Sequence, residues 1–237
     1  MKRRNFLFII IIFVLASIFL DAVSIRAQEV KKDLAAVSSK SKIKCNILVD
    51  LTELKLFLIN ENANEIIKSY PVACGKPTTP SPIGTWTIVS KSSNWGKGFG
   101  SRWMALNVPW GKYGIHGTNK PLSIGAAQSL GCIRMLNRDV EDLYNRVGHG
   151  TTVVIYGGPY GIFINNFRTL APGDRGSDVF EVQRKMKNAG YYPWNLDGVY
   201  GDNMKSQVVK FRKDNKLSIT HNIDVEFYNK IGMRSFE

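Results

Sequence analysis

The chain has 237 residues, of which 44% are hydrophobic, and a chain of this size can bury one substantial core and one small one. Its net charge of +13 indicates an anionic partner or surface, for which nucleic acid, anionic lipid and an anionic cell wall all qualify. The three histidines and three cysteines lack the paired spacing of common metal-binding motifs, so we expect a mechanism without a metal or other cofactor.

The N-terminal segment, residues 1–27, has the features of an export signal. A basic cluster, Lys2-Arg3-Arg4, precedes an apolar run over residues 6–20, as in secretory signals. The run is short for a membrane-spanning helix, which needs about 20 residues, although further apolar residues extend it. A cleaved signal and a retained membrane anchor over residues 6–25 both fit, and either places the rest of the chain outside the cytoplasm.

Residues 28–42 are rich in Ser, Lys and Ala and contain few bulky side chains. This composition predicts a flexible tether. Its lysines either contact anionic wall polymers or lipid headgroups, or they only keep the tether solvated.

Residues 43–157 have the pattern of a mainly β domain, in which short runs of β-forming residues alternate with turn residues. The first three runs read as an antiparallel meander. We predict strands over residues 45–50, 54–59, 65–72, 86–90, 104–108, 113–116 and 151–156, and one helix over residues 139–147. The expected fold class is a β-sandwich or barrel with one helix.

Two segments of this domain read as loops, and the first of them cannot be a regular strand. Residues 75–84 include Pro77, Pro80 and Pro82, and proline removes a donor from a strand. Residues 91–102 contain Trp95, Phe99 and three glycines. We expect this second loop to flank a substrate groove.

The segment over residues 115–135 contains a histidine and a cysteine, His116 and Cys132, each beside a glycine. A thiol with the ordinary pKa of about 8.5 is mostly protonated at neutral pH. A neighbouring histidine can take its proton, hold the thiolate as an ion pair and return the proton to a leaving amine. A buried thiol and a structural histidine are the alternative, but the two glycines and Arg134 together favour catalysis.

The glycines fit this hypothesis. Gly131 permits a tight turn before Cys132 and leaves room for a substrate carbonyl near backbone N–H groups, which can stabilise an oxyanion. Gly117 frees the main chain after His116, so that a carbonyl can accept the other imidazole N–H and fix the tautomer.

The motifs His116-Gly117-Thr118 and Ser129-x-Gly131-Cys132-Ile133-Arg134-Met135 resemble the signature of the L,D-transpeptidase (YkuD-like) catalytic domain. The resemblance spans residues 43–156. It implies a cysteine acyltransferase acting on peptidoglycan stem peptides, with Cys132 as nucleophile, His116 as base and acid, and the Gly117 carbonyl as orienter of His116. Many relatives carry a second histidine where this chain has Leu130, which leaves His116 as the only histidine available.

Several neighbours are candidates for substrate binding. Arg134 alternates onto the side of Cys132 in an extended segment, where it pairs with a substrate carboxylate or, alternatively, with Asp139 or Glu141. The other candidates, whose aromatic members can equally belong to the core, are Ser129, Gly131, Thr118, Asn137, Trp110 and Tyr113. His149 and His221 lack a cysteine or acidic partner at a telling spacing, so we expect them at the surface.

The cysteine count is odd, which matters in an exported protein. If Cys132 stays reduced, only Cys45 and Cys74 can form a disulfide. The predicted meander places them toward opposite ends of the sheet, so we predict that both are free.

Residues 158–168 read as a linker because of their Gly and Pro content, with a short strand at residues 162–164 as an alternative. Residues 169–237 read as a small helical bundle, with helices over residues 177–189, 203–215 and 225–231. The pattern Leu170-x-x-Gly173-x-x-Gly176-x-Asp178-Val179, together with the Asp197-Gly198 turn, resembles a three-helix peptidoglycan-binding domain. A basic DNA-binding bundle is the alternative, against which the export signal argues.

These features together lead us to expect an exported enzyme of cell-wall synthesis, remodelling and shape. Cys132 would form a thioester with a tetrapeptide stem, release D-alanine and transfer the acyl group to an amine of another stem, giving a 3-3 cross-link. The resemblance also implies inactivation by carbapenems. The partners expected are stem peptides and glycan, with no nucleic acid, and the bundle would concentrate the enzyme on the wall. The alternatives are an L,D-carboxypeptidase that hydrolyses the same bond and a non-catalytic wall-binding protein.

Overall fold

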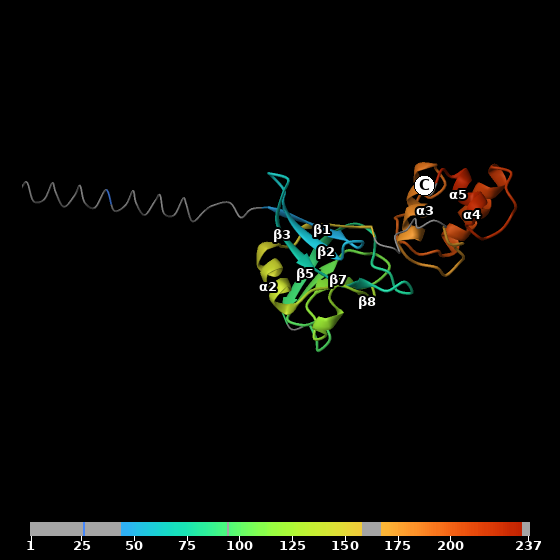
Figure 1. Cartoon of the computed structure of the whole chain (residues 1–237). Coiled ribbons are helices and arrows are strands. Elements are labelled where there is room, and N and C mark those ends of the chain that lie inside the picture. Colours follow the sequence, from blue (N-terminus) through green and yellow to red (C-terminus); the bar gives the residue numbers. More distant parts are fainter. Residues whose placement is uncertain (1–25, 27–43, 94, 158–166, 234–237) are drawn as a thin grey trace, which may run out of the picture. The chain divides into compact units, whose positions relative to one another are not determined.

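The computed structural model describes residues 26, 44–93, 95–157 and 167–233 (Figure 1). The predicted signal or anchor, the tether, most of the linker and the strand proposed for residues 162–164 lie outside these ranges. None of the helices among the residues described has both the length and the hydrophobicity needed to cross a bilayer.

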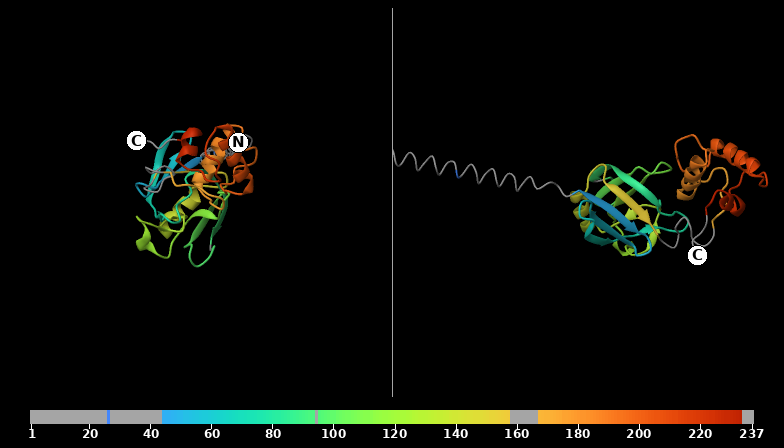
Figure 2. Two further views of the ribbon diagram at one scale, coloured as in Figure 1. Left: turned by 90° about the vertical axis from the view of Figure 1, so that its right-hand side faces the viewer. Right: turned by 90° about the horizontal axis from the view of Figure 1, so that it is seen from above.

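Eight strands form one mixed sheet in the N-terminal domain (Figures 1 and 2). They are β1 (Cys45–Asp50), β2 (Lys55–Asn60), β3 (Glu65–Pro71), β5 (Gly84–Ser93), β6 (Arg102–Leu106), β7 (Tyr113–His116), β9 (Ile133–Arg134) and β10 (Thr152–Tyr156). Their order is β3-β2-β1-β10-β5-β6-β7-β9. The predicted meander of the first three strands is confirmed, since β2 pairs antiparallel with both β1 and β3.

The last strand among the described residues, β10, occupies the middle of the sheet. β10 lies between β1 and β5, parallel to the first and antiparallel to the second. A second parallel pair, β7 with β9, forms the edge of the sheet opposite to β3. A separate pair is formed by β4 (Cys74–Gly75) and β8 (Ala127–Ser129), and a 3₁₀ turn, η1, covers Pro121–Ser123.

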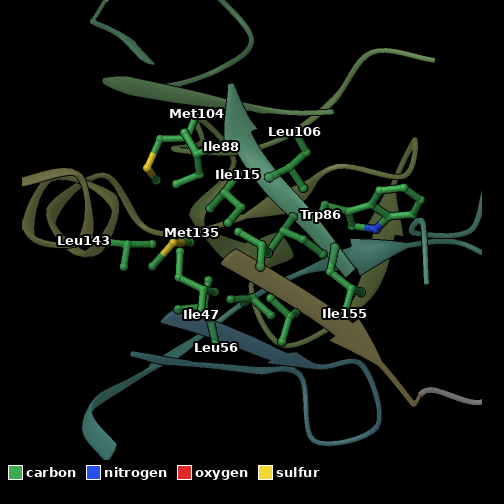
Figure 3. Packing of buried hydrophobic residues seen from close by; sticks show 14 of the residues in the cluster. Ile47, Leu56, Trp86, Ile88, Met104, Leu106, Ile115, Met135, Leu143 and Ile155 are labelled. Carbon is green, nitrogen blue, oxygen red and sulfur yellow. The ribbon is translucent and has the colours of Figure 1, made fainter. Parts of the chain in front are cut away.

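The sheet curls around a hydrophobic core (Figure 3). Alternation along β1 sends Ile47 and Val49 inward, where they are 1% and 0% exposed, as expected for a half-buried strand. Figure 3 shows Leu143, Met135 and Ile47 within this cluster. Burying large apolar side chains of this kind contributes about 1.5–3 kcal/mol each, so this core is what holds the strands of the site in place.

The helix α2 (Asn137–Arg146) packs against this core through Val140 and Leu143, its buried residues. Its Asp142 accepts hydrogen bonds from Lys68 Nζ (2.7 Å) and Tyr70 OH (2.9 Å) of β3. Its C-terminal end is held by Lys91 of β5, which donates to the carbonyls of Tyr144 (2.5 Å) and Val147 (2.6 Å). A lysine at this end also complements the helix dipole.

The C-terminal domain is the expected helical bundle. It contains α3 (Ser177–Asn188), α4 (Asp202–Asp214) and α5 (Val225–Lys230) around a core of its own. Arg212 of α4 is completely buried and pairs with Asp224 (2.7 Å) and Glu226 (3.0 Å). It also donates to the carbonyls of Asn222 and Ser218, so each side of its guanidinium has a partner.

Candidate active site

His116 ends strand β7, in a position fixed on both sides. β7 pairs antiparallel with β6, where Trp103 lies opposite His116, and parallel with β9, where Arg134 lies opposite His116. Ile115 points into the core with none of its surface exposed. Because successive side chains of a strand point to opposite faces, His116 lies on the other face of the sheet.

The parallel register places Cys132 on the same face as His116. Ile133 lies opposite Ile115 and is equally buried, so the residues on either side of it, Cys132 and Arg134, point away from the core. Cys132 is offset from His116 by one strand and two residues, which corresponds to a Cα separation of about 8 Å. The chain between the two residues therefore folds back, as the catalytic hypothesis requires.

The tautomer of His116 follows from its hydrogen bond to the next residue. Nδ1 lies 2.5 Å from the Gly117 carbonyl oxygen, and a carbonyl can only accept, so Nδ1 carries a proton. The lone pair of Nε2 is then left to act as a base. Gly117 itself is fixed by donating to the Arg102 carbonyl (3.0 Å).

The side chain of Asn137 packs against the backbone next to His116. Its Oδ1 accepts from Ser101 N–H (3.1 Å) and would lie only 2.2 Å from a Cβ added at Gly117 or Gly100. A side chain at either glycine would thus displace the Asn137 amide. An open pocket beside it is lined by Thr118, Asn119, Pro121, Leu136, Asn137 and Arg138.

Aromatic rings enclose the imidazole. Trp103 lies 5.6 Å from His116 between ring centroids, and Phe99 meets it edge-on at 5.0 Å. His116 is consequently only 3% exposed. This burial lowers the pKa of His116 to about 4, although hydrogen bonds to the backbone of Gly117 and Phe99 act in the opposite direction.

The thiol of Cys132 is partly exposed, with Sγ 4.0 Å from the Lys112 carbonyl. Burial raises its pKa, and the Gly114 backbone and the charge of Arg134 offset this only in part. A thiol with a raised pKa and an imidazole with a lowered one are both neutral at pH 7. The resting thiolate–imidazolium pair expected from the sequence is therefore not what this geometry favours.

The turn before Cys132 is closed by Ser129, which is 1% exposed. Its hydroxyl donates to the Cys132 carbonyl (2.6 Å) and accepts from Gly131 N–H (3.0 Å). Gly131 has φ +113°, and a Cβ there would lie 2.6 Å from Cε1 of Tyr113. Both the conformation and the close approach of the Tyr113 ring require glycine.

The remaining predicted substrate-binding residues fall in different places. Trp110 is 7% exposed and packs edge-on against Trp86 (5.2 Å) in the core, so it offers little surface to a substrate. Thr118 is 5% exposed and its hydroxyl accepts from Lys120 N–H (3.0 Å). Tyr113 is half-buried beside Gly131.

Arg134 is half-buried and close enough to lower the pKa of both His116 and Cys132 by its charge. Within the part of the chain that the structure describes, it forms no ion pair with Asp139 or Glu141, and Asp139 instead lies 3.6 Å from Arg138. The alternative prediction, a structural ion pair of Arg134 with Asp139 or Glu141, is therefore not observed among the described residues.

Two family models match separate parts of the chain. Residues 46–155 match the L,D-transpeptidase catalytic domain, YkuD. Residues 175–231 match a model described as "Putative peptidoglycan binding domain". Both matches confirm the resemblances inferred from the motifs.

Two curated relatives come from Bacillus subtilis. The protein named "Putative L,D-transpeptidase YkuD" is 48% identical over 92 residues, which cover 39% of this chain and 55% of that protein. The protein named "Putative L,D-transpeptidase YqjB" is 32% identical over 124 residues, 46% of this chain and 69% of that protein. The chain belongs to the L,D-transpeptidase family.

This family member spans about half the length of the YkuD relative. Among solved structures, the catalytic domain from E. faecium L,D-transpeptidase is similar over 48% of this chain and 98% of that one, with 24% identity and a TM-score of 0.42.

In this L,D-transpeptidase-family chain, the other histidines are at the surface, as predicted: His149 and His221 are both exposed. Cys45 and Cys74 are both buried, and no disulfide joins them. No cluster of three or more His, Cys, Asp or Glu side chains suited to a metal ion occurs among the described residues.

Sequence reasoning missed the aromatic enclosure of His116. Local sequence places Phe99 and Trp95 in a glycine-rich loop, and it gives no reason to single out Trp103. The only available signal was the density of aromatic residues over residues 95–103, because the register that sets Trp103 opposite His116 is not readable from local sequence.

Proposed function

We propose that this chain is an active L,D-transpeptidase in which Cys132 is the nucleophile and His116 the base and acid. The observation that supports this most is the shared sheet face: His116 at the end of β7 and Cys132, the residue just before β9, point to the same side, with Nδ1 of His116 hydrogen-bonded to the Gly117 carbonyl. This leaves Nε2 available to the thiol.

The first step begins from a neutral pair. Nε2 of His116 takes the thiol proton as Sγ of Cys132 attacks the carbonyl between the third residue of a tetrapeptide stem, a diamino acid, and its terminal D-alanine. The tetrahedral intermediate then collapses: the C–N bond breaks and protonated His116 gives its proton to the departing D-alanine amine. The product is a thioester on Cys132.

An oxyanion forms in the tetrahedral intermediate and needs donors. The N–H of Gly131 already donates to Ser129 Oγ, so we assign the principal role to the N–H of Cys132 itself. Ser129 then acts as a positioning residue, because its two hydrogen bonds shape the turn that aims this N–H.

In the second step an amine of another stem attacks the thioester, and His116 takes a proton from it. Expulsion of the Cys132 thiolate yields a cross-link between third residues, and the thiolate recovers its proton from His116. We propose that Arg134 binds a carboxylate of the stem peptide, since it lies close enough to His116 and Cys132 for its charge to lower the pKa of both.

Transfer to an amine competes with hydrolysis, which would make the enzyme an L,D-carboxypeptidase. The rings of Phe99 and Trp103 around His116 support transfer, because they reduce the access of water to the base. Mass analysis of the products from a purified tetrapeptide separates the two activities: cross-linked dimers indicate transfer, and tripeptide alone indicates hydrolysis.

We further propose that the protein acts outside the cytoplasm, either anchored or secreted, and that the bundle holds it on peptidoglycan. A second binding module raises the effective concentration of the substrate without changing the chemistry. The charge of +13 suits the anionic polymers of a wall or the headgroups of a membrane.

The direct test is the intact mass of the protein after incubation with a carbapenem. We expect the wild type to gain one adduct and Cys132→Ala to gain none, while Cys74→Ala, which changes a buried thiol, still gains one. An adduct on Cys132→Ala, or none on the wild type, would contradict the assignment of the nucleophile.

A further inference from the structure

One exposed aromatic side chain lies beside the candidate site and has no role in the chemistry above. Trp95 is 50% exposed, yet its ring is stacked on that of Trp103, with centroids 5.6 Å apart and planes within 10°. Trp103 is 3% exposed and in turn contacts the imidazole of His116. Trp95 is therefore the outer member of a short stack that begins at the base.

The loop that carries Trp95 is fastened to the site. Phe99 N–H donates to the Gly96 carbonyl (3.2 Å), and the Phe99 ring contacts His116. The Asn119 amide donates to the Lys97 carbonyl, which ties this loop to the segment between His116 and Cys132. The position of the Trp95 ring is thus set relative to the reacting groups.

The ring of Trp95 lies within the length of a stem peptide from the base. Two successive ring contacts of 5.6 Å separate Trp95 from His116, so the two rings are no more than about 11 Å apart, the span of about three extended residues. In a stem attacked at the carbonyl of its third residue, the same three residues separate that carbonyl from the sugar to which the stem is attached.

We propose that Trp95 is a binding platform for a pyranose ring of the glycan whose stem peptide acylates Cys132. The face of an indole ring carries partial negative charge and is apolar, so it attracts the C–H groups on the apolar face of a sugar. This proposal rests on the proposed function, because it assumes that the stem reacts at Cys132.

The test compares two soluble substrates that differ only in the sugar: a free tetrapeptide and the same tetrapeptide on its disaccharide. For Trp95→Ala we expect kcat/KM on the disaccharide form to fall about tenfold relative to kcat/KM on the free peptide, as for the loss of one buried ring face. Trp95→Phe, which keeps a smaller flat face, should lose about two- to threefold. Trp194→Ala, an exposed tryptophan of the C-terminal bundle, should leave the ratio of the two values unchanged.

Each other outcome overturns the proposal. If Trp95→Ala lowers both kcat/KM values equally, the ring acts through Trp103 on His116 and not on a sugar. If the ratio of the two values falls in Trp194→Ala instead, the sugar is bound by the bundle. An unchanged ratio in Trp95→Ala excludes the platform outright.

A binding measurement separates this proposal from the function itself. In a Cys132→Ala background, the dissociation constant of the disaccharide tetrapeptide should rise about tenfold on adding Trp95→Ala, and that of the free peptide should not. If the wild type converts neither substrate, the proposed function fails, and this titration still decides whether Trp95 binds sugar. Equal dissociation constants with and without Trp95 would reject the platform.

Discussion

At the scale of single residues, the environment of His116 determines how the pair with Cys132 works. The rings around it remove water, and burial disfavours the charged imidazolium, so the pKa of His116 falls to about 4. The imidazole is therefore neutral at pH 7, which is the form that the proposed mechanism requires of the base. Burial also raises the pKa of the Cys132 thiol, which favours its protonated form.

We predict that the acid limb of the pH profile for Cys132 acylation lies near pH 4, well below the value of about 6.5 for an ordinary histidine. The sign follows from the mechanism: below its pKa, His116 is protonated and cannot accept the thiol proton. The rate of adduct formation with a carbapenem, followed by mass from pH 3.5 to 8, measures this limb. Phe99→Ala, which opens the imidazole to water, should move the limb toward 6.5; a wild-type limb already at 6.5 would refute the prediction.

Gly131→Ala should damage both activity and folding. A Cβ at φ +113° would be strained and would lie 2.6 Å from the Tyr113 ring, which costs about 1–3 kcal/mol in the free energy of unfolding. Because the same turn aims the N–H of Cys132, we expect acylation to slow by at least about tenfold. Gly148→Ala is the matched control, since nothing lies within 4 Å of its added Cβ. If the two variants lose the same stability in denaturant unfolding and the same acylation rate, the turn at Gly131 has no particular need for glycine.

Local sequence is enough to single out His116, Cys132 and the glycines beside them as candidates, because the proposed chemistry depends on residue types at short spacing. It was not sufficient to place Trp110, which proved to be a core residue, or the rings around His116. Whether an aromatic side chain lies in the core or at the site depends on strand register, and register is fixed by partners far along the chain.

At the scale of elements, α2 is fastened to β3 and β5 by charged side chains rather than by packing alone. Asp142 accepts from Lys68, Arg146 and Tyr70, and chiefly the Lys68 hydrogen bond lowers the pKa of Asp142 to about 2. Since α2 begins shortly after β9 and carries Asn137, a shift of this helix would move Asn137 relative to the candidate site.

Asp142→Asn should reduce the free energy of unfolding at pH 7 by about 1–2 kcal/mol, a value discounted for solvent screening of a carboxylate that is about one quarter exposed. A carboxyl with a lowered pKa stabilises the fold above its unfolded pKa, near 3.9, and loses that effect as pH falls toward 2. The deficit of the variant should therefore shrink below pH 4. Urea unfolding at several pH values measures it, with Glu141→Gln as control; a deficit independent of pH would contradict the assignment.

The longer elements were readable from local pattern. The strand over Cys45–Asp50 and the three helices of the bundle appear within a residue or two of the predicted bounds. The two-residue strands β4 and β9 and the three-residue β8 were missed because so short a segment has no periodicity to detect. The parallel insertion of β10 beside β1 was also beyond reach, since it joins segments about a hundred residues apart.

At the scale of the whole molecule, the described residues form two hydrophobic cores, one for each of the two proposed functions. The first core holds the strands of the candidate site, and the second holds the bundle together around Arg212. Damage to the second core should therefore affect retention on the wall before it affects chemistry.

Arg212→Ala should destabilise the bundle by about 3–5 kcal/mol, because it leaves Asp224 and the carbonyls of Asn222 and Ser218 without their buried partner. We expect sedimentation with isolated peptidoglycan to be lost while conversion of a soluble tetrapeptide continues. Arg184→Ala, which breaks an exposed pair with Glu181, should cost less than about 1 kcal/mol and keep both properties. Loss of tetrapeptide conversion in Arg212→Ala would show that the two domains do not act independently.

The central place of β10 in the sheet has a consequence for how the protein is made. A growing chain that has reached only the helix α2 holds β1 and β5 but lacks the strand that joins them, so two half-sheets expose unpaired edges. Such edges invite pairing between chains. We therefore expect fragments that end before Thr152 to aggregate, whereas fragments that end after Tyr156 can complete the sheet. Folding of the N-terminal domain thus has to wait until the five residues of β10 have been synthesised.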